Sequence, residues 1–209
     1  MTSSVRSTRA IILAAGRSTR FKTKKSKLLF NICGQSMIMY PLRVFQSLAI
    51  PSTVIVGYQA DAVQHEVAKS GISDVSFVLQ EQQLGTGHAL ACSQSTWDCE
   101  EVLIMNGDMP LITPELIENL LTEHRQQKSA VSFFACDAFD PRGYGRVVEE
   151  DGLVRVVEQK DCSEEQRKIS LVNAGVYVMQ RSFIEQYVET LSKSSVTGEV
   201  YLPDLIAIA

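Results

Sequence analysis

A dense group of positive charges follows the first apolar segment of the chain. Residues 9–30 read RAIILAAGRSTRFKTKKSKLLF, and six basic residues crowd into the loop after the apolar run: Arg17, Arg20, Lys22, Lys24, Lys25 and Lys27. The 209-residue chain as a whole has a formal net charge of −4, so this loop stands against an acidic background. A guanidinium fork and a lysine point charge beside a glycine-containing turn suit a polyphosphate. We expect Arg20 and Lys27 to bind phosphate groups; a solvated basic loop is the alternative.

A second candidate loop reads LQEQQLGTGHA and combines amide side chains with a Gly-Thr-Gly turn. Gln80 and Gln83 each offer a donor and an acceptor together, which suits the edge of a nucleotide base. Gly85 and Thr86 can present backbone and hydroxyl groups to the same base. An ordinary turn with Thr86 as N-cap explains these residues equally well. His88 fits a helix face better than it fits a catalyst.

A carboxylate ends the apolar segment VLIMNGD, at Asp108. At the carboxyl end of a strand and facing a triphosphate, this side chain is a natural ligand for Mg²⁺. The alternative is N-capping of the next segment, which Pro110 makes less favourable because it interrupts an immediate helix.

A weaker group of residues suits a sugar. In PRGYGRVVEE, Gly143 and Gly145 bracket Tyr144, as a backbone that approaches a flat or sugar-like ligand would do. Tyr144 can equally be a packing residue. Glu158 and Asn173, farther along the chain, have side chains that can bond to sugar hydroxyls.

Short apolar runs alternate with amphipathic stretches, which predicts an α/β fold with a doubly wound, mainly parallel, Rossmann-like sheet and a small β-rich insertion lobe. Strands are expected at residues 10–15, 53–57, 75–79, 101–108, 130–136 and 173–180, helices at 36–49, 60–71, 87–97, 113–127, 182–192 and 202–208, and a hairpin at 145–159. In the helix at 113–127, Thr113 is the expected N-cap, and the expected buried face carries Leu116, Leu120 and Leu121. In such sheets ligands bind beyond the carboxyl ends of the strands, so the three candidate loops should meet in one crevice.

The composition excludes several classes of protein. Hydrophobic residues make up 45% and charged residues 21%, as in ordinary globular proteins. The acidic balance argues against nucleic-acid or membrane-surface binding, and no apolar run approaches the ~20 residues of a membrane span. The five cysteines form no CxxC pair, so we expect reduced, mostly buried thiols in a cytoplasmic protein without a signal peptide.

Several motifs, in this order and spacing, resemble one enzyme family. LAAGRSTR alone is shared by many nucleotidyltransferases, whereas QLGTGHA, NGDMPL, GYGRV, VEQKD, NAGVY and GEVYLPDLI together are specific. From about Arg9 onward the chain resembles the uridylyltransferase domain of the bacterial N-acetylglucosamine-1-phosphate uridyltransferase (GlmU) family. The resemblance implies a GT-A-like nucleotidyltransferase domain over residues 9–209, preceded by a flexible tail over residues 1–8.

The resemblance also implies a reaction: UTP and N-acetylglucosamine-1-phosphate give UDP-N-acetylglucosamine and pyrophosphate, a precursor step for peptidoglycan and lipopolysaccharide. Arg20 and Lys27 would be the catalytic residues, and Asp108 would bind Mg²⁺. The residues implied at the nucleotide are Leu13, Ala14, Ala15, Gly16, Gln80, Gln83, Gly85 and Thr86. Those implied at the sugar are Asn106, Gly145, Glu158, Asn173, Glu199 and Tyr201.

Some features depart from the family pattern. Ser18 stands where the family has a glycine, and Ser26 where it has the proline before the lysine. In the family, an asparagine beyond the position of Ala209 is the second Mg²⁺ ligand, and an acetyltransferase half mediates trimer formation; neither is part of this sequence, so its oligomeric state stays open. Two alternatives follow: a related nucleotidyltransferase of other specificity, such as a cytidylyltransferase, and a non-catalytic module that binds sugar nucleotides.

Overall fold

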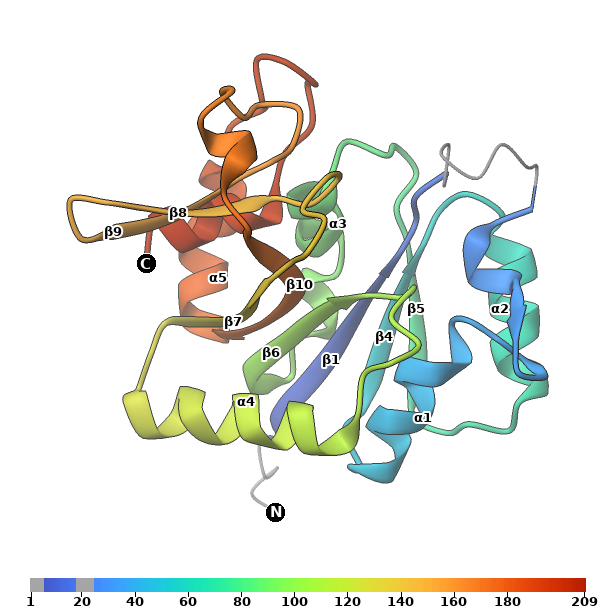
Figure 1. Cartoon of the computed structure of the whole chain (residues 1–209). Coiled ribbons are helices and arrows are strands. Elements are labelled where there is room, and N and C mark those ends of the chain that lie inside the picture. Colours follow the sequence, from blue (N-terminus) through green and yellow to red (C-terminus); the bar gives the residue numbers. More distant parts are fainter. Residues whose placement is uncertain (1–5, 18–24) are drawn as a thin grey trace.

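The structure, a computed structural model, describes residues 6–17 and 25–209. One eight-stranded sheet, in the order β5-β4-β1-β6-β10-β8-β9 with β7 also paired to β10, forms its centre (Figure 1). Helices cover both faces of the sheet. The α/β fold predicted from the sequence is confirmed.

The parallel half of the sheet contains the strands that the apolar runs predicted. It comprises β5 (Val75–Leu79), β4 (Ser52–Val56), β1 (Arg6–Ala14) and β6 (Cys99–Asn106). Their pairing is parallel, and Leu13 is in register with both Ile55 and Asn106. All five residues of β4 are buried, because helices cover the sheet on both sides.

Alternate residues of β1 belong to two different cores. Ala10 and Ile12 face a core shared with α1 (Met39–Ser47), α2 (Ala60–Lys69) and α4 (Pro114–Gln127). Ile11 faces a second core shared with α3 (Thr86–Cys92), α5 (Arg181–Tyr187) and the 3-10 helix η6 (Leu202–Ala207). The period of two along the strand therefore separates the two helical layers.

The antiparallel half begins at β10 (Leu171–Gln180), which pairs with β6 and with β7 (Val131–Asp137). The hairpin of β8 (Arg146–Glu150) and β9 (Leu153–Val157) turns at Asp151 and Gly152, which have φ angles of 52° and 76°. Two positive φ angles define the hairpin turn that an Asp-Gly pair predicts. The hairpin joins β10 through the single pair Val172–Arg146, so the small β-rich lobe extends the main sheet.

In α4 one predicted core residue is wrong. Thr113 caps the helix as predicted, since its Oγ1 accepts a hydrogen bond from the Leu116 N–H at 3.3 Å. The Leu116 side chain, however, is 42% exposed, and Ile117 is fully buried in its place, together with Leu120 and Leu121. A step of 100° per residue moves the buried stripe by one position, which leucine content alone does not reveal.

Four details of the secondary structure differ from expectation. Residues 31–36 form a short hairpin of β2 (Asn31–Ile32) and β3 (Gln35–Ser36), whereas the sequence predicted none there. The helix expected from residue 36 begins at Met39, and the last helix, η6, is a 3-10 helix. β1 starts at Arg6, inside the segment expected to be a tail, of which residues 1–5 lie outside the described residues.

All five cysteines are free thiols, as predicted. Cys99 and Cys162 are buried, but Cys33 and Cys136 are exposed, so the expectation of mostly buried thiols is wrong. Within residues 6–17 and 25–209, no helix is long and apolar enough to cross a membrane.

Candidate functional site

The carboxyl ends of β1, β5 and β6 bring the candidate loops to one edge of the sheet. Ala15 follows β1, and its carbonyl accepts a hydrogen bond from Tyr58 N at 3.1 Å. Gln80 follows β5, and its N–H bonds to Val56 O at 2.8 Å. Gly107 follows β6, and its N–H bonds to Leu13 O at 3.0 Å. The edge predicted from the topology is therefore a single surface that backbone hydrogen bonds hold together.

At this edge Lys27 Nζ forms an ion pair with Asp108 Oδ2, between residues predicted separately as a phosphate ligand and a metal ligand. Their side chains keep 25% and 29% of their accessible surface. Lys27 opens the 3-10 helix η2 (Lys27–Leu29), in which Leu28 is buried and packs so closely on Gly107 that an added Cβ there would lie 3.2 Å from the leucine. The packing of Leu28 thus places the lysine beside the carboxylate.

Ser26, one of the departures from the family pattern, has a specific local role. Its φ of −57° would suit proline, but its backbone N–H donates to Gln59 Oε1 at 2.7 Å, which proline cannot do. Gln59 itself is left-handed, with φ at 55°. Ser26 Oγ is buried without a hydrogen-bond partner. The backbone of this position is therefore used and its side chain is not.

The base loop, residues 80–88, is held by its own amide side chains. Gln80 is 3% exposed, and its Nε2 donates to Gly85 O at 3.1 Å and contacts His88 Nδ1 at 2.9 Å. Gln83 Nε2 donates to Gln80 O at 3.0 Å. A Cβ added to Gly57 would lie 2.9 Å from that Gln83 nitrogen, so the glycine makes room for it.

A C-terminal segment, residues 198–202, lies against the base loop; we call it the strap. Val200 N donates to Leu84 O at 2.8 Å, and Gly87 N donates to Val200 O at 2.9 Å. Gly85 has a φ of 110°, and a Cβ there would lie 2.3 Å from Val200 O, so this turn needs glycine. The base loop and the strap form one hydrogen-bonded unit.

Thr86, expected at the base, also contacts the strap. Its Oγ1 accepts a hydrogen bond from Leu202 N at 3.0 Å. Because a hydroxyl can accept and donate at once, this bond leaves its proton available to a ligand.

Three residues expected at the sugar lie close together beside β10. Asn173 N donates to Gly145 O at 2.9 Å, and a Cβ on Gly145 would lie 3.3 Å from Glu158 Oε1. The Asn173 side chain is buried, donates to the Tyr177 hydroxyl at 2.5 Å and accepts from Gly175 N at 3.0 Å. Asn173 thus bonds mainly within the protein, and burial raises the pKa of the Tyr177 phenol that it contacts.

Asn106 lies on the other side of Gly175. A Cβ added to that glycine, whose φ is 77°, would lie 2.8 Å from Asn106 Nδ2. Asn106 therefore joins the group formed by Gly145, Glu158 and Asn173.

Glu199 and Tyr201, the last expected sugar ligands, belong to the strap. Glu199 is exposed, and its backbone carbonyl accepts from Ser194 N at 2.8 Å. The Tyr201 hydroxyl bonds to Thr197 Oγ1 at 2.6 Å, and burial raises the pKa of this phenol. Burial, together with the Asp161 charge, also raises the pKa of nearby Asp204. The strap thus bonds to the base loop and carries two of the expected sugar ligands.

Arg146 is an organising residue that our reading of the sequence missed. It is 1% exposed, donates to Tyr144 O, and donates to Gln159 Oε1 at 2.9 Å. Gln159 Oε1 also accepts from Gly143 N at 3.1 Å, so the two side chains hold the glycine-rich loop in place. Alternation along the RVV run does not reveal it, because Val147 and Val148 on opposite faces of β8 are both buried.

Two predicted positions cannot be placed: Arg20 and Ser18 lie outside the described residues. Gly16 is exposed, and a Cβ added there would meet no atom within 4 Å. The described residues contain no group of three or more carboxylates, histidines or cysteines that could hold a metal by itself. Asp108 Oδ2 is paired with Lys27, whereas no described residue bonds to Oδ1. A single carboxylate oxygen left open by the described residues fits a magnesium ion that binds mainly to phosphate oxygens.

Comparison with known proteins shows extended similarity. A family model for the MobA-like NTP transferase domain matches residues 10–162. Three curated relatives are each named bifunctional protein GlmU. The one from Fervidobacterium nodosum is 38% identical over 202 residues, covering 96% of this chain and 44% of its own length. That from Trichlorobacter lovleyi is 40% identical over 205 residues, with 96% and 44% covered. That from Desulfotalea psychrophila is 34% identical over 206 residues, with 95% and 59% covered.

These relatives confirm the resemblance that the sequence motifs indicate, although the chain spans only about half of their length. A solved structure of UDP-glucose pyrophosphorylase complexed with UDP-glucose matches with a TM-score of 0.76 and 18% identity, covering 97% of this chain and 86% of that chain. At this identity the match supports the fold alone.

Proposed function

Because the chain belongs to the MobA-like NTP transferase domain family, we propose that it transfers a uridylyl group from UTP to N-acetylglucosamine-1-phosphate. The products are UDP-N-acetylglucosamine and pyrophosphate. The observation that carries the proposal is the ion pair of Lys27 and Asp108 at the same sheet edge as the base loop. A cation for phosphate, a carboxylate for a metal and an amide for a base are thereby combined in one place.

The reaction needs alignment and charge compensation more than proton transfer. A phosphate oxygen of the sugar phosphate forms a bond to the α-phosphorus of UTP. The bond from that phosphorus to the bridging oxygen breaks, and pyrophosphate leaves with the electron pair. Since the attacking phosphate is already an anion at neutral pH, no general base is required. Lys27 beside the triphosphate, with Arg20 in the same role, would hold the reacting groups in line and offset the spreading negative charge.

Magnesium fits this arrangement as a partner of the substrate. Asp108 would hold the ion through the carboxylate oxygen to which no described residue bonds, while the phosphates supply most of the remaining ligands. When bound, the ion adds charge neutralisation at the triphosphate. Lys27, paired with the other oxygen of the same carboxylate, would lie beside the phosphates and bind them.

Residues 9–209 are proposed as one nucleotidyltransferase domain. In this proposal Leu13, Ala14, Ala15 and Gly16 line the nucleotide beside the base loop, and the group of Asn106, Gly145, Glu158, Asn173, Glu199 and Tyr201 holds the amino sugar. Five free thiols, two of them exposed, suit a reducing compartment, so we propose a cytoplasmic location and a role in cell-envelope precursor synthesis.

The test is a transfer assay on the purified chain with Mg²⁺. UTP and CTP are each offered with N-acetylglucosamine-1-phosphate, glucose-1-phosphate and no acceptor, and both pyrophosphate and the sugar nucleotide are measured. We expect UTP with the amino-sugar phosphate to give the highest kcat/KM. A higher value for another pair would establish a related nucleotidyltransferase instead, and binding of UDP-N-acetylglucosamine without turnover would establish a binding module.

A further inference from the structure

His88 lies beside Gln80 in the base loop, and nothing in the transfer chemistry above uses it. We propose that His88 is a positioning residue for base selection: its Nδ1 holds the Gln80 amide with the carbonyl oxygen toward the base. This orientation favours a base whose ring N3 carries a proton. The inference rests on the proposed function only in taking residues 80–88 as the base site.

The Gln80 side chain contacts the backbone of Gly85. The Gln80 atom that lies 3.1 Å from Gly85 O must be a donor, because a backbone carbonyl can only accept. That atom is therefore the amide nitrogen Nε2. Gly85 is itself fixed, since its left-handed turn packs against Val200. A rigid carbonyl thus determines which end of the amide faces inward.

The Gln80 side chain also contacts His88. The same Gln80 Nε2 lies 2.9 Å from His88 Nδ1, and an amide nitrogen can only donate. Nδ1 must then be an acceptor, so the neutral ring carries its proton on Nε2. Cys92 Sγ lies 3.9 Å from both ring nitrogens, a distance that packs the sulfur on the ring and leaves Nδ1 to Gln80. Two acceptors therefore hold both amide hydrogens of Gln80.

The remaining polar atom of the Gln80 side chain is Oε1. Among the described residues none bonds to Gln80 Oε1, and this oxygen is not one of their buried atoms without a partner. This oxygen is therefore not fully buried, and the two inner bonds fix its orientation as an acceptor. The N3–H of uracil can donate to it, whereas the N3 of cytosine would place one acceptor against another. Turning the amide over would cost both inner hydrogen bonds of a residue that is only 3% exposed.

Equilibrium binding of UTP and of CTP to the full chain tests this, by calorimetry on three proteins: wild type, His88→Asn and His88→Leu. Asparagine keeps an acceptor near the position of Nδ1, and leucine removes it. For His88→Leu we expect the preference for UTP over CTP to fall about 10-fold, the size of one hydrogen bond to a buried group. For His88→Asn we expect the wild-type preference to within about 3-fold.

If both variants lost the preference for UTP over CTP to the same extent, His88 would only pack, and the proposal would be wrong. An unchanged preference in folded His88→Leu would also overturn it. So would a wild type without preference for UTP. A long-range ¹H–¹⁵N spectrum of the wild type gives a check that needs no leucine variant: Nδ1 of His88 should be the unprotonated nitrogen, and a protonated Nδ1 contradicts it. Neither measurement needs turnover, so a protein that shows the His88-dependent preference but transfers nothing would overturn the proposed function alone.

Discussion

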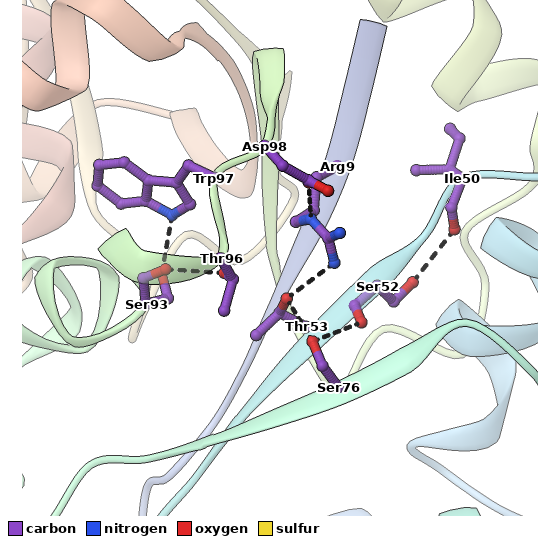
Figure 2. A network of polar contacts seen from close by, with 9 residues as sticks. All are labelled: Arg9, Ile50, Ser52, Thr53, Ser76, Ser93, Thr96, Trp97 and Asp98. Carbon is purple, nitrogen blue, oxygen red and sulfur yellow. Dashed lines mark hydrogen bonds and ion pairs between the residues drawn. The ribbon is translucent and has the colours of Figure 1, made fainter. Parts of the chain in front are cut away.

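The two ends of the parallel sheet use polar side chains in opposite ways. Toward the amino ends, Arg9 donates to Asp98 Oδ1 at 2.7 Å and to Thr53 Oγ1 at 3.4 Å, and Thr53 bonds to Ser76 at 2.9 Å (Figure 2). This chain of bonds crosses β1, β4 and β5 and ends on the backbone of Ser52. At the carboxyl ends, Gln80 and Asp108 each keep one oxygen to which no described residue bonds.

A hollow of about 950 Å³ also lies at the amino end of the sheet. Among the residues that line it, Arg125 bonds to both Glu101 carboxylate oxygens and to the Thr8 hydroxyl at 2.7–3.0 Å. Its most prominent charge is therefore already matched within the protein. We therefore expect a ligand at the carboxyl end, where hydrogen-bonding capacity is unused, and not in this hollow.

The largest expected effect is on turnover at the carboxyl end. Lys27→Met and Asp108→Asn should each lower kcat by about 100-fold or more, because the first removes a positive charge that would offset the triphosphate and the second removes the carboxylate that would hold Mg²⁺. The melting temperature should change little, since the pair is partly exposed. Steady-state kinetics and thermal melts on the same preparations measure both. A folded variant with nearly full turnover would remove the contrast between the two ends.

The next largest effect is on stability, through the contact between the base loop and the strap. Gly85→Ala should lower the free energy of unfolding by about 3 kcal/mol, because its Cβ meets Val200 O in a left-handed turn. Gly71→Ala is the matched control: it also has a positive φ, of 71°, but open space around it, so we expect a loss of about 1 kcal/mol. Urea unfolding measures both values. Equal losses would mean that the backbone angle alone matters and the strap does not.

Arg9 should affect stability without affecting chemistry. Arg9→Met removes the ion pair and the bond to Thr53, and we expect a loss of about 1 kcal/mol, because Asp98 is already 59% exposed and can return to water. Turnover per folded molecule should match the wild type. If kcat fell as far as in Lys27→Met, the amino-end network would belong to the catalytic machinery after all.

The smallest expected difference concerns Ser26. Ser26→Ala removes only a buried hydroxyl without a partner, whereas Ser26→Pro also removes the N–H that donates to Gln59. Proline restricts the unfolded chain, which offsets part of that loss. We therefore expect the Ser26→Pro protein to be about 0.5 kcal/mol less stable than the Ser26→Ala protein. Denaturant titrations of the pair resolve this difference. A more stable proline variant would show that the Gln59 bond contributes nothing.

Sequence patterns predict the long strands of the main sheet and the order of the loops, but not the short hairpin of β2 and β3. β5 lies at the residues predicted, and the Asp151-Gly152 turn forms because two left-handed positions suit that pair. These features depend on residues close to one another in the chain. Leu116 shows the limit of such reasoning, because a helix face shifts by one residue without any change in composition.

Much of the site depends on contacts that no local pattern contains. Lys27 and Asp108 are 81 positions apart, and each was predicted for a separate role without the ion pair between them. Thr86 and Leu202 are 116 positions apart, and only the packed structure reveals that the threonine hydroxyl accepts from that backbone. His88 was within reach, since it lies in the same loop as Gln80, but its ring has a role only once Gly85 has fixed the amide.

The hydrogen bonds between the base loop and the strap would couple the binding of the two substrates. Val200 bonds to residues on both sides of Gly85, and the strap also carries Glu199 and Tyr201. A nucleotide that stabilises this conformation of the base loop would also stabilise the strap, and with it the positions of Glu199 and Tyr201. By linkage the reverse holds to the same extent, so each substrate would tighten the binding of the other.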